Sequence, residues 1–360
     1  MSLRALPLLA LLAGCSREAN DTRRPEAARA TPYILDGALD VDGNTVRLGV
    51  SDGAFVVAES LPEGTRVVDL TGSFVVPAFI DSHVHLAYYP VAADLPKGGI
   101  AGAVDFAAPL GALASPPAGL VVEQSGPMLT PLLGYPTQSW GAGGYGLEVA
   151  TPEEAATAVD RLLDAGASFV KTPLLGAQGV NDEVLAALVA RAHDRGARVA
   201  VHALAAADAT RAVASEADIF AHTPTEALAA EQLAAWGSRA VVGTLSAFGA
   251  SQAALANLRA LADAGALVLY GTDLGNTRTV GIQPAELDAL VRAGFSGDDI
   301  VHSATDRAAD FWGMEELGRL EPGKRASFLV LMEDPAVAPA TLAAPSGVVM
   351  DGVTVAGALP

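Results

Sequence analysis

Residues 77–86 read PAFIDSHVHL, an apolar run that ends in two histidines, His83 and His85. Alternate side chains of a β-strand point to the same face, so a strand here aims both imidazoles in one direction. The preceding residues 73–76, SFVV, extend the apolar run. The segment therefore predicts a buried strand that presents a pair of histidines at its carboxyl end.

Similar strands recur along the chain, separated by helical segments. Residues 151–154, TPEE, are typical of a helix start; this helix ends at Gly166, and a strand, ASFVK, follows at 167–171. Units of helix, glycine and apolar strand continue to LVLYG at 267–271. With SFVVPAFID, GAVDFAA and GLVVEQS upstream, the strands number eight, which predicts an α/β fold of the (β/α)8 TIM-barrel type. Prolines within 86–98 and 108–118 predict that the first two helices are short or degenerate.

The two ends of the chain have a different pattern. Residues 32–76 contain short apolar runs separated by turn signals such as Asp42-Gly43-Asn44, and the last forty residues look alike, with a turn at Asp351-Gly352. We therefore expect both termini to pair into one small composite β-sandwich. The predicted division is a signal peptide at 1–14, a tether at 15–31, the sandwich at 32–76 plus 319–360, and the barrel at 77–318.

The first fifteen residues, MSLRALPLLALLAGC, indicate a targeting segment. Arg4 precedes an apolar stretch that is too short to span a bilayer, as in a cleaved signal peptide. The end of the segment resembles the lipobox of bacterial lipoproteins, which implies lipidation of Cys15. The protein is then expected in the bacterial cell envelope, lipid-anchored and facing the periplasm or the exterior. An ordinary secretory signal with an incidental cysteine is the alternative.

Charge and cysteine content exclude several classes of protein. The formal net charge is −19 and the chain has one cysteine, so a nucleic-acid-binding face, a disulfide scaffold and a cysteine-based zinc site are all excluded. Membrane contact is expected only through a lipid at Cys15. We expect a small-molecule substrate as the partner, and self-association into a homo-oligomer remains open.

Side chains that bind metals gather at the ends of the predicted strands. In a parallel barrel these ends form the catalytic face. Four imidazoles and a carboxylate suit Zn²⁺ or a similar ion. The candidate metal ligands are His83, His85, Lys171, His202, His222 and Asp273.

Lys171 requires a separate explanation, because an ammonium beside two dications would be repelled. Burial and nearby cations both lower the pKa of a lysine, and a neutral amine adds CO₂ to become an anionic carbamate. Such a carbamylated lysine is an oxygen ligand for two metals. The alternative is a lysine paired with an acid such as Asp273.

These residues and their surroundings resemble the amidohydrolase superfamily, in its imidazolonepropionase-like and prolidase-like branch. The resemblance implies that His83, His85 and Asp273 bind one metal, that His202 and His222 bind another, and that carbamylated Lys171 and a hydroxide bridge them. The chain departs from the family pattern at several positions, including Ala78 and Ala326-Ser327. Two of these departures bear on the substrate: Leu204 and Ala221 stand where many relatives carry polar residues. The motifs that carry the resemblance are PAFIDSHVHL (77–86), FVKT (169–172), VHA (201–203), AHT (221–223), GTD (271–273) and the stretch 302–331.

The predicted function is metal-dependent hydrolysis of a C–N bond in a dipeptide, N-acyl amino acid or cyclic amide. A metal-bridging hydroxide would attack, with Asp273 as the proton shuttle. Tyr89, Trp140 and Arg278 are candidate substrate contacts, with Arg278 placed to hold a carboxylate or else simply solvated. The alternatives are a mononuclear deaminase or lactone hydrolase of the same superfamily, and a catalytically silent envelope binding lipoprotein.

Overall fold

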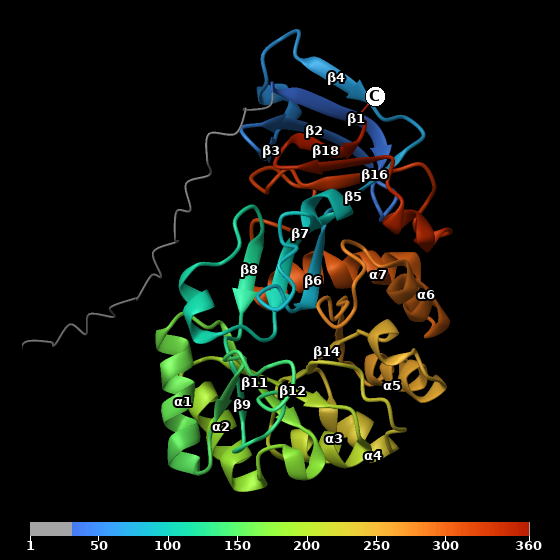
Figure 1. Cartoon of the computed structure of the whole chain (residues 1–360). Helices are drawn as coiled ribbons and strands as arrows, with labels where there is room; N and C mark the ends of the chain where they lie inside the picture. Colours follow the sequence, from blue (N-terminus) through green and yellow to red (C-terminus); the bar gives the residue numbers. More distant parts are fainter. Residues whose placement is uncertain (1–30, 360) are drawn as a thin grey trace, which may run out of the picture.

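The structure, a computed structural model, describes residues 31–359. Cys15 and the predicted signal peptide therefore lie outside the described residues. The centre of the molecule holds the eight predicted strands, which run parallel in a sheet of three and a sheet of five (Figure 1). In order they are β6 (Phe79–Val84), β7 (Ile100–Asp105), β8 (Val121–Gln124), β11 (Phe169–Leu174), β12 (Arg198–Ala203), β13 (Ile219–Phe220), β14 (Ala240–Val242) and β15 (Leu267–Leu269).

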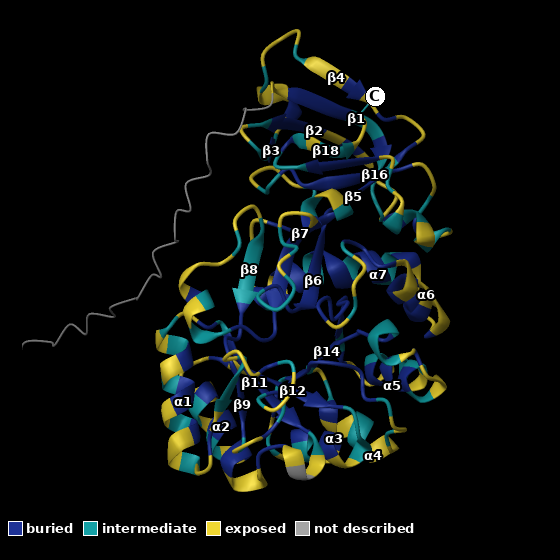
Figure 2. Ribbon diagram, viewed as in Figure 1, coloured by how far each residue is buried: buried dark blue, intermediate teal, exposed yellow. Residues whose placement is uncertain are grey.

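Helices follow most of these strands and cover them. These strands are mostly buried, with β8 half-buried, whereas the outward faces of the helices are exposed (Figure 2). The start of α1 follows the predicted capping pattern, because the Thr151 side chain accepts a hydrogen bond from the Glu154 backbone N–H. The helices are α1 (Pro152–Asp164), α2 (Asp182–Asp194), α3 (Ala206–Ala214), α4 (Ala230–Trp236), α5 (Gln252–Asp263), α6 (Pro284–Arg292), α7 (Gly297–Ala304) and α8 (Asp306–Trp312).

The first two strands lack α-helices, as the prolines predict. Short 3₁₀ turns at Leu95–Gly98 and Leu110–Ala114 follow β6 and β7. After β8 the chain forms a small parallel pair, β9 (Met128–Thr130) and β10 (Gly146–Glu148), before α1 begins. The loop between β9 and β10 extends over the carboxyl ends of the strands.

The eight strands do not form one closed ladder. At one seam, β6 and the segment after β15 are joined by backbone hydrogen bonds, including one of 2.9 Å from Asp273 N to His83 O. At the other seam a backbone hydrogen bond of 2.9 Å connects Ser168 N to Gln124 O, and the Ser168 hydroxyl also donates to the Glu123 carboxylate. The side chain of Thr172 donates to Leu129 O in β9. The α/β class is confirmed, and the ladder is interrupted because β9 contacts β11 at this seam.

A tryptophan from α8 packs into the interior beneath the histidines. The indole N–H of Trp312 donates a hydrogen bond of 3.0 Å to Ser82 Oγ. Its ring contacts Phe169 and Phe106, with centroids 5.1 and 5.9 Å away. The interior is therefore a packed core rather than a pore, and the site lies on top of it.

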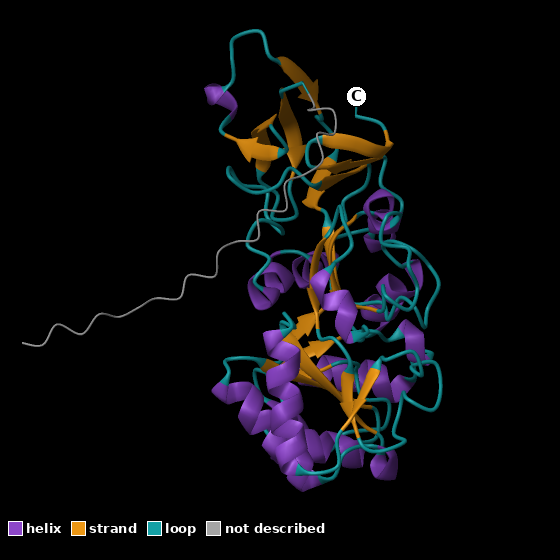
Figure 3. Ribbon diagram, turned by 60° about the vertical axis from the view of Figure 1, so that its left-hand side comes forward, coloured by secondary structure: helices purple, strands orange, loops and turns teal. Residues whose placement is uncertain are grey.

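The first and last parts of the described chain meet in a separate, eight-stranded sheet, called the second sheet below, at one end of the molecule (Figure 3). β5 pairs antiparallel with β16 and meets β1 at a single position, Leu39 opposite Phe74. Because β5 joins the two halves into one continuous sheet, a two-layer sandwich is not confirmed, and the domain boundaries stay a prediction. The strands are β1 (Tyr33–Leu39), β2 (Thr45–Ser51), β3 (Ala54–Val56), β4 (Arg66–Asp69), β5 (Phe74–Pro77), β16 (Phe328–Leu331), β17 (Gly347–Met350) and β18 (Val353–Gly357).

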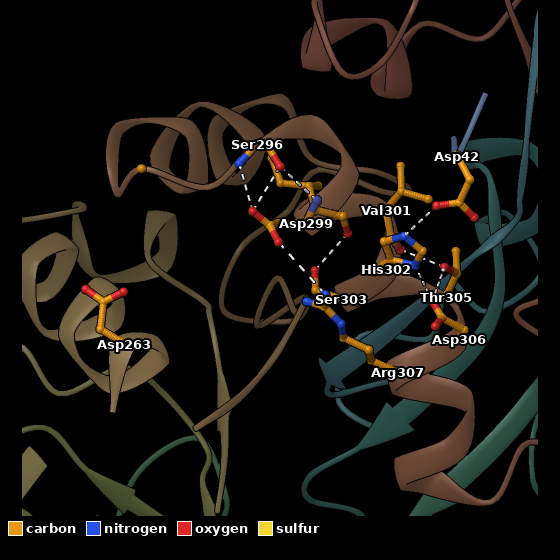
Figure 4. Close-up of polar contacts among 12 residues, drawn as sticks. Asp42, Asp263, Ser296, Asp299, Val301, His302, Ser303, Thr305, Asp306 and Arg307 are labelled. Carbon is orange, nitrogen blue, oxygen red and sulfur yellow. Dashed lines mark hydrogen bonds and ion pairs between the residues drawn. The ribbon is translucent and has the colours of Figure 1, made fainter. Parts of the chain in front are cut away.

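Polar contacts connect α7 with the turn after β1 (Figure 4). The His302 ring lies 2.8 Å from Asp306 Oδ1 through Nδ1, and 3.7 Å from Asp42 Oδ1 through Nε2. The same helix starts at a capping box, in which Ser296 and Asp299 exchange hydrogen bonds. His302 thus serves the junction between the two sheets and not the cluster of metal-binding side chains.

Within residues 31–359, none of the helices combines the length and apolar character required to cross a membrane.

Candidate metal centre

Three of the predicted ligands converge most tightly. The histidine pair belongs to the end of β6, and Asp273 follows β15, the strand on the other side of the seam. Asp273 Oδ1 lies 3.6 Å from His83 Nε2 and 3.1 Å from His85 Nε2. One donor atom from each residue lies within 4.8 Å of the others, and all three side chains are buried. Such a set is suited to a single cation.

The orientation of His83 points to the same conclusion. Its Nδ1 lies 2.7 Å from the carbonyl oxygen of Ala221. A carbonyl only accepts, so Nδ1 carries the proton and Nε2 keeps its lone pair. Nε2 is buried without a hydrogen-bond partner among the described residues, yet it faces the oxygen of Asp273. Two electron-pair donors held this close in a buried site fit a cation between them.

The other two histidines lie beside this group. The His222 ring stacks on His83 at 4.4 Å between centroids and contacts the His202 ring at 4.6 Å. His222 Nδ1 lies 3.0 Å from the hydroxyl oxygen of Thr244. Burial, together with neighbouring positive groups, lowers the pKa of His202 to about 3 and holds the pKa of His83 and His222 well below the usual value. These three imidazoles are therefore neutral, as metal ligands must be.

Lys171, in the middle of β11, is almost fully buried at 1% exposure. Its Nζ has no hydrogen-bond partner within the described chain and lies 4.6 Å from the centroid of Phe106. The same Phe106 ring stacks on His83 at 4.0 Å, which places Lys171 close to the histidines. Burial lowers the pKa of Lys171 to about 7, against the opposing effect of Asp273. Among residues 31–359 no ion pair joins Lys171 to Asp273, so the alternative of a simple lysine–acid pair is not what the structure shows.

Asp273 occupies an unusual backbone conformation that the side chain of Asn276 supports. Its φ is +55°, in the left-handed region, which aspartate and asparagine adopt more readily than other non-glycine residues. The amide of Asn276 donates to both carboxylate oxygens, at 3.0 and 3.2 Å. The sequence analysis did not identify Asn276, although its position three residues after a candidate ligand was a usable signal.

Two buried carboxylates outside the predicted ligand set hold the surrounding backbone. Asp81 accepts hydrogen bonds from the backbone N–H of His83 and from the backbone and side chain of Thr272. Asp105 accepts hydrogen bonds from the backbone N–H groups of Ala87 and Ala107. Burial raises the pKa of Asp81 to about 7 and that of Asp105 to about 6. Asp81 lies in the quoted motif PAFIDSHVHL, but the local pattern did not distinguish it from a core residue.

The three predicted substrate contacts separate into two places. The ring of Trp140 lies 5.3 Å from the ring of His85, next to the metal-binding cluster. Tyr89 packs against the hydrophobic core, and the exposed guanidinium of Arg278 lies over its ring at 4.5 Å. Tyr135, which is not among the three predicted substrate contacts, has its ring centroid 5.9 Å from that of His202.

Comparison with known proteins gives a consistent result. Residues 134–358, more than half of the chain, match the model of the amidohydrolase family. An adenine deaminase from Deinococcus deserti is 27% identical over 330 residues, which cover 86% of this chain and 54% of the deaminase. The chain thus spans about half the length of this relative.

Solved structures with a similar fold cover about nine-tenths of the chain. A protein from Bifidobacterium longum, provisionally assigned as a prolidase, is 25% identical with a TM-score of 0.73, over 91% of this chain and 95% of its own. A Xaa-Pro dipeptidase with methionine bound in its active site has a TM-score of 0.75 at 19% identity, over 91% of this chain and 100% of its own. Together with the family match and the cluster of histidines and aspartate, these likenesses show that the chain belongs to the amidohydrolase family.

Proposed function

We propose that this protein is a metal-dependent hydrolase that cleaves the C–N bond of a small amide. The observation that carries the proposal is the buried, unpartnered Nε2 of His83, held 3.6 Å from an oxygen of Asp273. A cation bound by both side chains explains why they lie so close together. A hydrogen bond does not, because His83 Nε2 has no hydrogen-bond partner among the described residues. Membership of the amidohydrolase family supports the same chemistry.

Two divalent ions, with zinc as the preferred metal, are the fuller form of this proposal. His83, His85 and Asp273 would hold one ion, and His202 and His222 the other. Lys171 would join both after its neutral amine adds CO₂: a nitrogen–carbon bond forms, one proton leaves the nitrogen for solvent, and the side chain becomes a carbamate anion. The unpartnered Nζ and the pKa of about 7 support this step.

The chain's own residues have distinct parts in the reaction. Metals of this kind polarise a carbonyl and lower the pKa of water from 15.7 to about 7. Asp273 then takes the proton of the attacking water at a carboxylate oxygen and gives it to the leaving nitrogen. Asn276 restrains that carboxylate through bonds to both oxygens, so the proton moves at a defined position. The imidazole of His83 is fixed by its bond to Ala221 O.

The test combines metal content with turnover. Purified protein, incubated with Zn²⁺ and bicarbonate, is expected to retain two metals per chain and to hydrolyse members of a panel of dipeptides, N-acyl amino acids and cyclic amides. Asp273→Asn should reduce turnover by about 10²–10⁴-fold, whereas Asp263→Asn, at an exposed ion pair with Arg259, should leave it unchanged. Protein that retains no metal under these conditions contradicts the proposal.

A second candidate, a mononuclear deaminase, is favoured by the likeness to adenine deaminase. It requires one metal per chain and no carbamate, and release of ammonia from adenine or a related base would be its signature. The buried Lys171 argues against it, since a lysine without a bridging role would cost stability in this position. The metal content of the wild-type protein separates the two candidates.

The location of the protein is a further part of the proposal. We propose that Cys15 carries a lipid and anchors the enzyme to the bacterial cell envelope, as the lipobox-like segment suggests. Expressed in a bacterium from the full gene, the protein should partition into the detergent phase of Triton X-114. Cys15→Ala should move it to the aqueous phase. Detergent partitioning that is unchanged in this variant would contradict lipidation.

A further inference from the structure

Four aromatic side chains lie together beside the histidines of the metal centre, and we refer to them as the aromatic rim: Tyr88, Tyr135, Trp140 and Tyr145. Trp140 lies at its centre, with ring centroids 5.0 Å from Tyr88, 6.0 Å from Tyr135 and 5.5 Å from Tyr145. All four are half-buried, so part of each ring is available to a ligand. The rim is assembled from the segment after β6 and the loop between β9 and β10.

Hydrogen bonds hold the rim in place. The indole N–H of Trp140 donates to the Tyr135 hydroxyl oxygen at 2.8 Å. The Tyr145 hydroxyl donates to Ala87 O at 2.9 Å, which ties the loop to the segment that follows the histidine pair. Rings fixed in this way lose little freedom when a ligand packs against them.

The aromatic rim is in direct contact with two of the candidate metal ligands. Trp140 contacts the ring of His85, and Tyr135 contacts the ring of His202. A further aromatic ring, that of Phe248, lies 4.8 Å from the His222 ring. A substrate whose amide reaches the metals must therefore place its adjoining group among aromatic rings.

A positive charge lies at the outer edge of the rim. The guanidinium of Arg278 is 5.7 Å from the centroid of Tyr88 and 4.5 Å from that of Tyr89. It is exposed, and within residues 31–359 it forms no ion pair with a carboxylate. Tyr88 thus contacts both Arg278 and Trp140, so one fragment of a ligand would meet aromatic and cationic groups together.

We propose that the preferred substrate is an N-acylated aromatic amino acid, whose ring packs against Trp140 and Tyr88 and whose free carboxylate pairs with Arg278. This inference rests on the proposed function and narrows its substrate class. Stacking and edge contacts among aromatic rings provide specificity beyond simple burial. A guanidinium with no competing partner is suited to a carboxylate.

Binding of product-like ligands to the zinc-loaded protein tests the inference without requiring turnover. Isothermal titration should show that L-phenylalanine, the amine product of such a hydrolysis, binds at least about tenfold more tightly than L-alanine. L-phenylalaninamide, which lacks the carboxylate, should bind more weakly than the acid. Equal affinities for the phenylalanine and alanine ligands, or no binding of either at millimolar concentration, would overturn the inference.

Substitutions in the aromatic rim test whether its rings cause the preference for the phenylalanine ligand. Trp140→Leu and, from a separate segment, Tyr88→Leu should each reduce the preference for phenylalanine over alanine to less than about threefold. Phe311→Leu is the matched control, since Phe311 also lies beneath a guanidinium, that of Arg198, but away from the site. A preference that survives both rim variants would contradict the proposal.

The carboxylate contact has its own pair of variants. Arg278→Gln should remove the difference between the acid and the amide, whereas Arg259→Gln, at a guanidinium stacked on Phe295, should retain it. Failure of the proposed function is distinguishable from failure of this inference: the former is loss of metal binding or hydrolysis, and the latter is loss of ligand selectivity in protein that binds metal.

Discussion

Asp81 and Thr272 are separated by 191 positions in the sequence, yet the carboxylate of Asp81 accepts two hydrogen bonds from Thr272, at 3.0 Å from the backbone nitrogen and 2.5 Å from Oγ1. Asp81 also accepts a bond from the backbone N–H of His83. Thr272 directly precedes Asp273. The buried carboxylate thus aligns the two strand ends that carry the tightest group of candidate ligands.

Asp81→Asn is expected to weaken this alignment. An asparagine has one acceptor oxygen and would point its NH₂ group at a donor, so the free energy of unfolding should fall by about 1–3 kcal/mol. Metal affinity should fall by about 10–100-fold, as is usual for groups that orient ligands. Urea unfolding and competition with a metal chelator measure the two effects. Wild-type metal affinity in this variant would show that the alignment is unimportant.

The strand arrangement could be predicted because its signals are local. An apolar run such as that before His83 ends at a polar residue, and a glycine such as Gly166 marks the preceding helix end. The carboxyl ends of parallel strands meet on one side, so residues as distant as Lys171 and His222 could be assigned to one place without a structure.

The contacts that support the site could not be predicted in this way. The bond from Asn276 to Asp273 depends on a turn in which Asp273 has φ of +55°, and no pattern of hydrophobicity signals this conformation. The contact of Trp140 with His85 depends on how a glycine-rich loop folds over the strand ends. The joining role of β5 in the second sheet likewise depends on which edges meet after the chain has folded.

Two substitutions of Asp273 separate its backbone role from its chemical role. Asparagine adopts a positive φ at a lower cost in free energy than alanine does, so the free energy of unfolding of Asp273→Ala should be about 1–2 kcal/mol lower than that of Asp273→Asn. Both should reduce kcat by about 10²–10⁴-fold, because neither side chain can move a proton. Urea unfolding and turnover of a substrate found in the panel provide the measurements. Equal stability of the two variants would contradict the backbone argument.

Replacing Lys171 should have opposite effects on stability and metal content. Methionine fills a similar volume without an unpartnered buried amine, so metal-free Lys171→Met should be more stable than metal-free wild type by at least about 1 kcal/mol. The same variant should retain fewer metals per chain after zinc loading. Urea unfolding in the presence of a chelator, and elemental analysis of the loaded protein, test the two expectations. A less stable metal-free variant would show that the amine has an unrecognised favourable contact.

The pH dependence of stability should contain a contribution from Glu286, which is fully buried at the start of α6. Burial raises its pKa from 4.5 to about 7, although the carboxylate accepts hydrogen bonds from the backbone N–H groups of Ser246 and Leu245. Between pH 4.5 and about 7, Glu286 keeps its proton in the folded protein but has lost it in the unfolded chain. The stabilising contribution is therefore complete below pH 4.5 and disappears as the pH rises to about 7.

Glu286→Gln cannot ionise, and it provides the reference for this effect. Relative to the variant, the unfolding free energy of the wild type should fall by about 3 kcal/mol between pH 4.5 and 7.5, from a pKa difference of about 2.5. The contribution of Asp105 is present in both proteins and cancels, whereas the pKa of Asp81 is raised in part by the charge of Glu286 and loses that influence in the variant. Urea unfolding at three pH values across this range measures the difference. Parallel stability profiles for the two proteins would mean that Glu286 remains ionised in the fold, with its charge supported by the N–H groups of residues 245 and 246.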